Sequence, residues 1–198
     1  MQKHLMFTIF IGLFFGSFFL LNAAQAVEPV NNPKQTTEID KSNITDRRKA
    51  ETMIDDEKIE SDAKEKLKAL SFYDKSHIVA TSYNGRLLII GQAPTEENMR
   101  EAAAAISKVP HVREVINEVE AREPTSFSTR SNDTLITAKV KSTLLTHKNI
   151  KSNVFKVITE NGVVYLFGLT TSAEAETASD LARSVEGVRE VVLLTEEA

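Results

Sequence analysis

The chain contains one internal repeat, and this repeat limits its possible folds more than any other feature. The stretch YNGRLLIIG at 83–91 returns as ENGVVYLFG at 160–168, which sets an offset of 77 residues. Further on, VPHVREV at 109–115 aligns with VEGVREV at 185–191 after a one-residue deletion. The repeated unit is about 65 residues long, enough for a small domain to fold alone. The chain is therefore predicted to hold two copies of one domain.

Each repeated unit predicts the element order helix, strand, strand, helix, strand. Apolar residues spaced as in Ile59, Ala63 and Leu67 indicate a first helix. The Asn-Gly pairs predict two-residue hairpin turns, because Asn and Gly tolerate positive φ. The strands that follow, RLLII and VVYLF, are almost continuously apolar. They are expected at the centre of each sheet, ending at Gly91 and Gly168.

A second helix and a last strand complete each unit. The helices are expected at about 95–108 and 172–185, with N-caps at Thr95 and Ser172 and acidic residues in the first turn. A helix that joins two strands of one sheet makes a right-handed crossover. The predicted fold class is α+β, with two tandem domains that each pack two helices against a three-stranded mixed sheet.

The N-terminal stretch has the features of a secretory signal peptide. An apolar run from Leu5 to Leu21 leads to Ala24 and Ala26, a small-x-small cleavage pattern, so residues 1–26 are expected to be removed. The alternative is an uncleaved membrane anchor, for which the run is short.

Polar composition separates the remaining parts of the chain. Residues 27 to about 46 are polar and lack periodicity, and the segment 27–54 is expected to be flexible. The domains are expected at 55–122 and 133–198, with a linker at 123–132. Within this linker, Phe127 is expected to pack between the domains, and contact with a partner is the alternative.

The residue content argues against several functions. Cysteine is absent, which excludes disulfides, thiolate zinc sites and a lipid-bearing cysteine. The histidines beyond the signal, His77, His111 and His147, lack metal-binding spacing, and no P-loop or Gly-x-Ser-x-Gly motif occurs. We therefore expect no enzyme activity, no catalytic residue, no metal site and no cofactor. The net charge of −4 argues against general binding of nucleic acid.

Several stretches resemble a known family. The central glycine of each unit and the pattern GVREV at 187–191 resemble the BON domain of bacterial osmotic-stress and nodulation proteins. Two copies behind an export signal resemble the DolP-like and OsmY-like periplasmic proteins. The likeness is closer to the DolP-like group in DRRKAETMIDDEKIE at 46–60, SNDTLITAKVKSTLLT at 131–146 and VITENGVVYLFGLTT at 157–171.

This resemblance implies a non-enzymatic periplasmic protein, peripheral at the outer membrane, that supports outer-membrane integrity. It also implies that the first helix of the second domain binds anionic phospholipid. The tryptophan with which DolP-like proteins contact lipid corresponds to Leu135 in this chain. DolP-like proteins are typically lipoproteins, whereas this chain has no cysteine to carry the lipid.

Comparison of the two first helices supports the same site. At the offset of 77 residues, Leu135 stands opposite Lys58, and Lys139 opposite Asp62. The segment 133–151 has four lysines and one acid, a charge of +3, whereas 56–74 has four lysines and six acids, a charge of −2. Basic residues attract an anionic bilayer by about 1 kcal/mol each. The predicted lipid-binding residues are Leu135, Ala138, Lys139, Lys141, Ser142 and Lys148.

Two other interpretations remain open at this point. The polar side of the second domain's first helix is, in the plainer interpretation, a solvated surface. In the other, the protein is an adaptor or chaperone that docks on outer-membrane assembly proteins or acts in osmotic stress.

Overall fold

The computed structural model describes residues 46–148 and 150–198. The predicted signal peptide, its cleavage residues Ala24 and Ala26, and most of the segment 27–54 lie outside the described residues. Both predicted domains belong to one compact unit.

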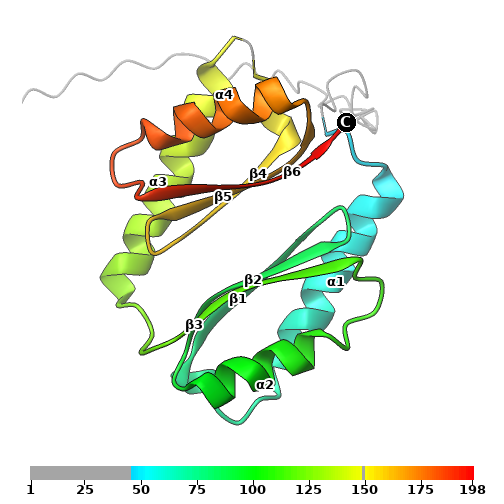
Figure 1. Ribbon diagram of the computed structural model, residues 1–198, viewed down its shortest axis with the longest axis vertical. Coiled ribbons are helices and arrows are strands. Elements are labelled where there is room, and N and C mark those ends of the chain that lie inside the picture. The colour runs from blue at the N-terminus through cyan, green and yellow to red at the C-terminus, as the bar shows by residue number, and fades with distance from the viewer. Residues whose placement is uncertain (1–45, 149) are drawn as a thin grey trace, which may run out of the picture. The chain divides into compact units, whose positions relative to one another are not determined.

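The first domain has the predicted order of elements (Figure 1). Strands β1 and β2 are antiparallel, and β3 pairs in parallel with β2 on its other side. A short 3-10 turn, η2, precedes β1. The elements are α1 (Ala50–Lys68), η2 (Tyr73–Lys75), β1 (His77–Tyr83), β2 (Arg86–Ala93), α2 (Glu96–Ile106) and β3 (Glu114–Ala121).

The second domain repeats this order and sheet topology, with the sheet order β4-β5-β6. The α+β fold class and the mixed three-stranded sheets are therefore confirmed. The elements are α3 (Phe127–Thr146), η3 (Ser152–Val154), β4 (Phe155–Glu160), β5 (Val163–Thr170), α4 (Ser172–Arg183) and β6 (Glu190–Glu197).

The Asn-Gly pairs form the predicted hairpin turns. Asn84 and Gly85 have φ values of 53° and 75°, and Asn161 and Gly162 have values of 50° and 76°. Positive φ at both central residues is the signature of a type I′ turn, whose twist matches that of the flanking strands. The two turns therefore set the register of both hairpins.

The first helices of the two domains begin earlier than the sequence predicted. Helix α1 begins at Ala50, inside the segment expected to be flexible. Helix α3 begins at Phe127, inside the expected linker, because the Ser126 side chain accepts a hydrogen bond from Thr129 N and caps the helix. Only residues 122–126 connect β3 to α3.

Two smaller predictions about element ends were wrong. Gly91 and Gly168 do not end the central strands, since β2 continues to Ala93 and β5 to Thr170. The N-cap of α4 is Thr171 rather than Ser172, and it forms a capping box with Glu174. The N-cap of α2 is Thr95, as predicted.

In each domain the helices cover one face of the sheet. In the first domain, Ile59 and Leu67 of α1 pack with Leu87 and Ile89 of β2 in a buried cluster. In the second, helices α3 and α4 bury the corresponding face through residues Ile136, Val140, Leu144, Ala178, Ala182, Val164 and Leu166.

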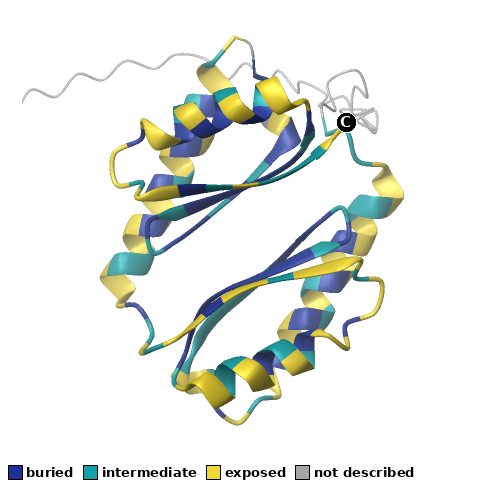
Figure 2. Cartoon of the chain, viewed as in Figure 1, coloured by how far each residue is buried: buried dark blue, intermediate teal, exposed yellow. Residues whose placement is uncertain are grey.

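The other faces of the two sheets pack against each other. Tyr83, Leu88 and Ile90 form one buried cluster with Tyr165 and Phe167 of the second domain. The rings of Tyr83 and Phe167 stack, with centroids 5.8 Å apart. The central strands β2 and β5 are therefore buried on both faces (Figure 2), which explains why their sequences are almost unbroken apolar runs.

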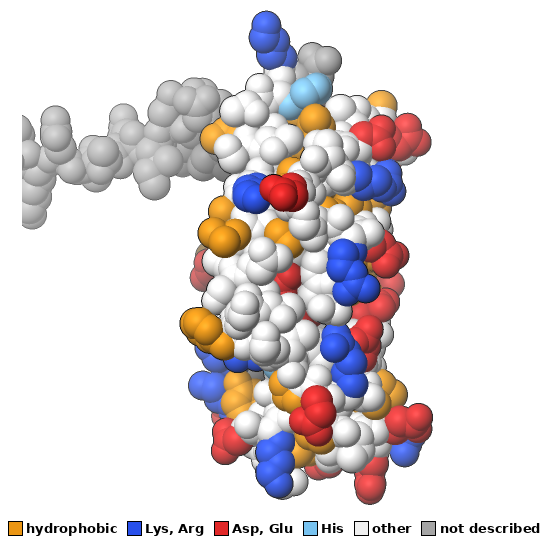
Figure 3. All heavy atoms as spheres, turned by 90° about the vertical axis from the view of Figure 1, so that its left-hand side faces the viewer, with side chains coloured by type: hydrophobic (Ala, Val, Ile, Leu, Met, Phe, Trp, Pro, Cys, Tyr) orange, Lys and Arg blue, Asp and Glu red, His pale blue; other side chains and the backbone are white. Residues whose placement is uncertain are grey.

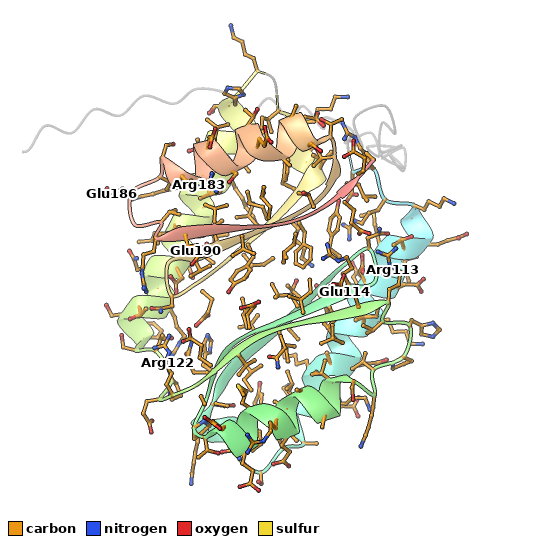
Figure 4. All side chains as sticks on the ribbon, viewed as in Figure 1. Arg113, Glu114, Arg122, Arg183, Glu186 and Glu190 are labelled. Atoms are coloured by element: carbon orange, nitrogen blue, oxygen red, sulfur yellow. The ribbon has the colours of Figure 1, made fainter. Side chains whose placement is uncertain are left out.

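A polar contact flanks this cluster near the first hairpin turn. The Tyr83 hydroxyl donates to Val154 O at 3.1 Å. Close by, Arg113 Nη2 donates to Glu196 Oε1 at 2.6 Å. Figure 4 shows Arg113 at this end of β3 and Arg122 at the opposite end. These bonds join the first domain to η3 and β6 of the second.

A second polar contact joins the domains near the second hairpin turn. The Glu160 carboxylate accepts from Gln92 Nε2 at 2.7 Å and lies 3.3 Å from His77 Nε2. Gln92 Oε1 accepts from Thr125 N at 2.9 Å, which ties the connection to α3 into the same group. Glu160 occupies the repeat position of Tyr83. The last residue of the first strand in each domain therefore contacts the other domain.

Candidate functional site

Helix α3 carries apolar side chains on the side that faces away from its core. Phe127, Leu135 and Leu145 are 78%, 61% and 68% exposed. Phe127 and Leu145 are separated by about five helical turns and project in the same direction, and Leu135 is about 80° away. Ala138 and Ser142, both exposed, lie between these directions. We call these five residues the α3 strip.

Lysines flank the α3 strip on both sides. Lys139 and Lys141 are both exposed and, at 100° per residue, lie about 160° apart around the strip. Lys148 lies two residues past the last helical residue, Thr146, near the negative end of the helix dipole, which favours a cation. Lys139 Nζ lies 3.8 Å from Glu186 Oε2, but this pair is exposed and therefore weak. The positive charges of these lysines therefore remain available to an external binding partner.

All six predicted lipid-binding residues are exposed. The structure brings five of them together on one side of α3: Leu135, Ala138, Lys139, Lys141 and Ser142. Lys148 lies just beyond the helix end, because the helix stops at Thr146. Binding of lipid by these residues stays a prediction at this point.

Sequence reasoning missed two members of the strip. Phe127 was expected to pack between the domains, and this was wrong, because the side chain is among the most exposed apolar groups of the described chain. Leu145 was not singled out. Their spacing of eighteen residues was a usable signal, but only if α3 is known to begin at Phe127.

The same positions of the first domain carry a different surface. In α1, the residues opposite Leu135, Lys139 and Ser142 are Lys58, Asp62 and Glu65. Ile54 is the one large apolar residue of α1 that is exposed. The apolar strip between lysines therefore belongs to α3 and has no equivalent on α1.

Buried carboxylates fix the inner side of both first helices. Asp133 Oδ2 and Oδ1 accept from Asn161 N and Gly162 N, both at 2.8 Å. Asp56 binds the first hairpin turn in the same way, at 2.7 Å and 2.8 Å. These aspartates lie inside the helices rather than at their N-termini, so they act as anchors for the turns.

The anchor in the first domain has further partners. Asp56 also accepts from Ser82 Oγ at 2.6 Å and from Arg48 Nη1 at 2.7 Å, and Arg48 stacks over the Tyr83 ring at 4.1 Å. Burial by itself would raise the pKa of Asp56, but the bonds from Ser82, Gly85 and Arg48 outweigh it and lower the pKa. The ionised carboxylate is therefore part of the folded domain.

Figure 3 shows the face of the molecule over the side on which α3 lies. Hydrophobic side chains stand apart among uncharged atoms on one part of this face, and acidic and basic side chains gather on the other.

Among the described residues, no group of three or more His, Asp or Glu side chains is arranged to hold a metal ion. No helix in the described part of the chain is long and apolar enough to cross a membrane.

Comparison with known proteins identifies the repeated unit. The model of the BON domain matches residues 55–123 and 132–194, which together cover most of the chain. The chain belongs to the BON-domain family. This agrees with the resemblance read from the repeated glycine and the GVREV pattern, and the two matches fall on the two halves of the repeat.

Three curated relatives of this BON-domain chain are informative. A 21 kDa hemolysin of Actinobacillus pleuropneumoniae is 36% identical over 77% of this chain and 79% of its own length. The outer membrane lipoprotein DolP of Haemophilus influenzae is 37% identical over 75% of this chain and 77% of its own. Osmotically-inducible protein Y of Escherichia coli is 49% identical over a shorter region, 30% of each chain.

Proposed function

We propose that this BON-domain protein binds anionic phospholipid surfaces through α3 and so supports the integrity of the bacterial outer membrane. The observation that carries the proposal is the α3 strip flanked by Lys139 and Lys141. It acts without an enzymatic step or cofactor, because its interaction with lipid is reversible adsorption.

The chemistry of the strip suits a helix lying in the membrane interface. A helix of 20 residues is about 30 Å long, and Phe127 and Leu145 lie near the two ends of α3. Both side chains can therefore contact the bilayer when the helix lies along its surface. Insertion of a few apolar side chains contributes affinity in proportion to the apolar area buried. Each lysine near the surface adds about 1 kcal/mol with anionic lipid. The attachment is therefore weak, reversible and sensitive to salt.

The relatives support the location that this function needs. One of them is described as an outer membrane lipoprotein. This likeness supports a location in the cell envelope. Within the envelope, the proposal assigns the protein to the periplasm, peripheral to the outer membrane. No cysteine is available for a lipid anchor, so retention at the membrane rests on surfaces such as the α3 strip.

Co-sedimentation of the mature protein with vesicles tests the proposal. Vesicles containing phosphatidylglycerol are expected to bind the protein, and phosphatidylcholine vesicles to bind it far less. Leu135→Asp and Phe127→Asp are expected to weaken binding because each places a charge in the apolar strip. Lys139→Glu is expected to weaken it by about fivefold or more and to reduce its dependence on salt.

Two matched variants on α1 serve as controls. Ile54→Asp places the same charge at an exposed apolar position of the first domain, and Lys58→Glu makes the same reversal at the repeat position of Leu135. Both are expected to bind vesicles like the wild type. Equal losses of vesicle binding in the α1 and α3 variants, or no vesicle binding by the wild type, would contradict the lipid proposal and favour the adaptor hypothesis.

A further inference from the structure

The first domain contains one continuous groove where the second domain has two smaller hollows. The groove lies between α1 and the edge strand β1 and encloses about 540 Å³. Glu57, Glu60 and Lys64 line one wall, and Ile78 and Ala80 line the other. The equivalent space between α3 and β4 is divided into two hollows of about 220 Å³ and 310 Å³, and Phe155, at the repeat position of Ile78, lines the smaller one.

The β1 wall of this groove is an open strand edge. Strand β1 pairs with β2 on one side only. Ser82 N donates to Glu60 Oε1 at 2.7 Å and Ser82 O accepts from Lys156 Nζ at 2.9 Å, so this residue directs its backbone groups away from β2. Along an antiparallel strand, the N–H and C=O groups of successive residues point alternately to one side of the strand and to the other. Ala80 and Ile78 therefore point their N–H and C=O groups outward too, into the groove.

These outward groups have no partner in the described part of the chain. Neither Ile78 nor Ala80 makes a hydrogen bond on that side, to backbone or to side chains of residues 46–148 and 150–198. Two residues that each offer a donor and an acceptor at strand spacing match the backbone of one further extended segment. The groove thus offers main-chain pairing for about three or four residues of a ligand.

We propose that this groove binds an extended peptide segment of another protein, one that carries a basic side chain and adds as a fourth strand beside β1. The negative charge of the groove wall is the reason for proposing a basic side chain in the bound segment. Glu57 lines the groove and makes no ion pair with any side chain of the described residues. Glu60 lies on the same wall, with its Oε1 atom already paired with Lys156.

The repeat supplies a comparison for this charge. The residues of the second domain at the positions of Glu57 and Glu60 are Thr134 and Thr137, which carry no charge. Lys64 of the same wall is matched by Lys141, so the two carboxylates are what distinguish the first domain. They disfavour an anionic lipid, so the inference does not depend on the lipid proposal. Loss of either activity would leave the other intact.

Amide hydrogen exchange followed by NMR on the mature protein tests the pairing. The probe is a blocked peptide of alternating valine and lysine, and the control peptide has glutamate in place of lysine. With the lysine peptide, exchange at Ile78 and Ala80 is expected to slow by about tenfold. Val79 and Thr81, whose amides already face β2, are expected to change little. The glutamate peptide is expected to have no effect.

Two variants examine backbone pairing and charge separately. Ala80→Pro removes the outward amide without removing a bond to β2, as edge strands tolerate, and is expected to abolish peptide binding. Glu57→Lys is expected to weaken it at least about fivefold. Glu101→Lys, the same charge change at an exposed site of α2, is the matched control and is expected to bind like wild type.

Three results would overturn the inference. They are absence of binding by the lysine peptide, equal binding by the glutamate peptide, and equal losses in the Glu57→Lys and Glu101→Lys variants. If Ala80→Pro does not fold, as shown by its thermal unfolding, the two charge variants decide the outcome. Vesicle binding by the same variants is expected to stay unchanged, which separates this groove from the α3 strip.

Discussion

Equivalent residues of the two repeats are not under equal constraint, as the central glycines show. A Cβ at Gly91 would lie 1.9 Å from the backbone oxygen of His77, and its φ of 119° is one that other residues rarely adopt. Gly168 has no positive φ, and a Cβ there would lie 3.0 Å from Val154 O. The alignment equates the two positions, but only Gly91 strictly requires a glycine.

Substitution by alanine is expected to separate these positions. Gly91→Ala should lower the free energy of unfolding by more than about 3 kcal/mol, because backbone must move to relieve the clash and the strain. Gly168→Ala should lower it by roughly 1 kcal/mol, since a shift of a few tenths of an ångström suffices. Urea unfolding measures both, and equal effects would contradict the assigned difference.

At the scale of the element, each first helix is attached to the hairpin of its own domain. Asp133 in α3 and Asp56 in α1 accept hydrogen bonds from both residues of an Asn-Gly turn. The sequence marks these aspartates only by their equal distance from the turns. Their function as anchors depends on the packing of the helix against the sheet, which brings residues 28 and 29 positions apart into contact.

Removal of these anchors is expected to be costly in both domains. Asp133→Ala leaves two turn amides without their acceptor and should destabilise the protein by roughly 2 kcal/mol. Asp56→Ala should destabilise it more, because Ser82 and Arg48 lose their acceptor as well. Chemical denaturation of each variant tests this order. The reverse order would contradict the prediction, because it would show that the bonds from Ser82 and Arg48 to Asp56 add no net stability.

At the scale of the whole molecule, the two domains are joined by an apolar cluster with polar contacts around it. Among these contacts, Glu160 accepts from Gln92 and lies beside His77. Burial by itself would raise the pKa of Glu160, but its contacts with His77 and Gln92 outweigh the burial and lower the pKa. The carboxylate therefore stabilises the contact between domains in its ionised form.

The lowered pKa of Glu160 predicts a dependence of stability on acid. The unfolded chain takes up this proton more readily than the folded one, so the stabilisation is present above the ordinary pKa of glutamate and is lost as pH falls through the folded value. Urea midpoints between about pH 6 and pH 3 should therefore fall more for the wild type than for Glu160→Gln. Equal slopes would show that Glu160 doesn't contribute to this dependence.

The order of elements was readable from the sequence because it depends on local chemistry. Asn84-Gly85 and Asn161-Gly162 adopt the positive φ values that their residue types favour. The apolar spacing of Ile59, Ala63 and Leu67 places these residues on the buried side of α1. Predictions of element ends failed for β2 and β5, which pairing with β3 and β6 extends past the glycines, and at the start of α3, where Ser126 caps the helix inside the expected linker.

The sequence by itself determined the duplication, the element order and the contrast in charge between α1 and α3, since these depend on residue type and spacing. Only the tertiary structure decided which surfaces remain exposed. Packing of one sheet on the other buries Tyr83 and Phe167 completely or almost so, while the early start of α3 leaves Phe127 in solvent. A residue's exposure depends on which parts of the chain pack over it, and those parts can lie far away in the sequence.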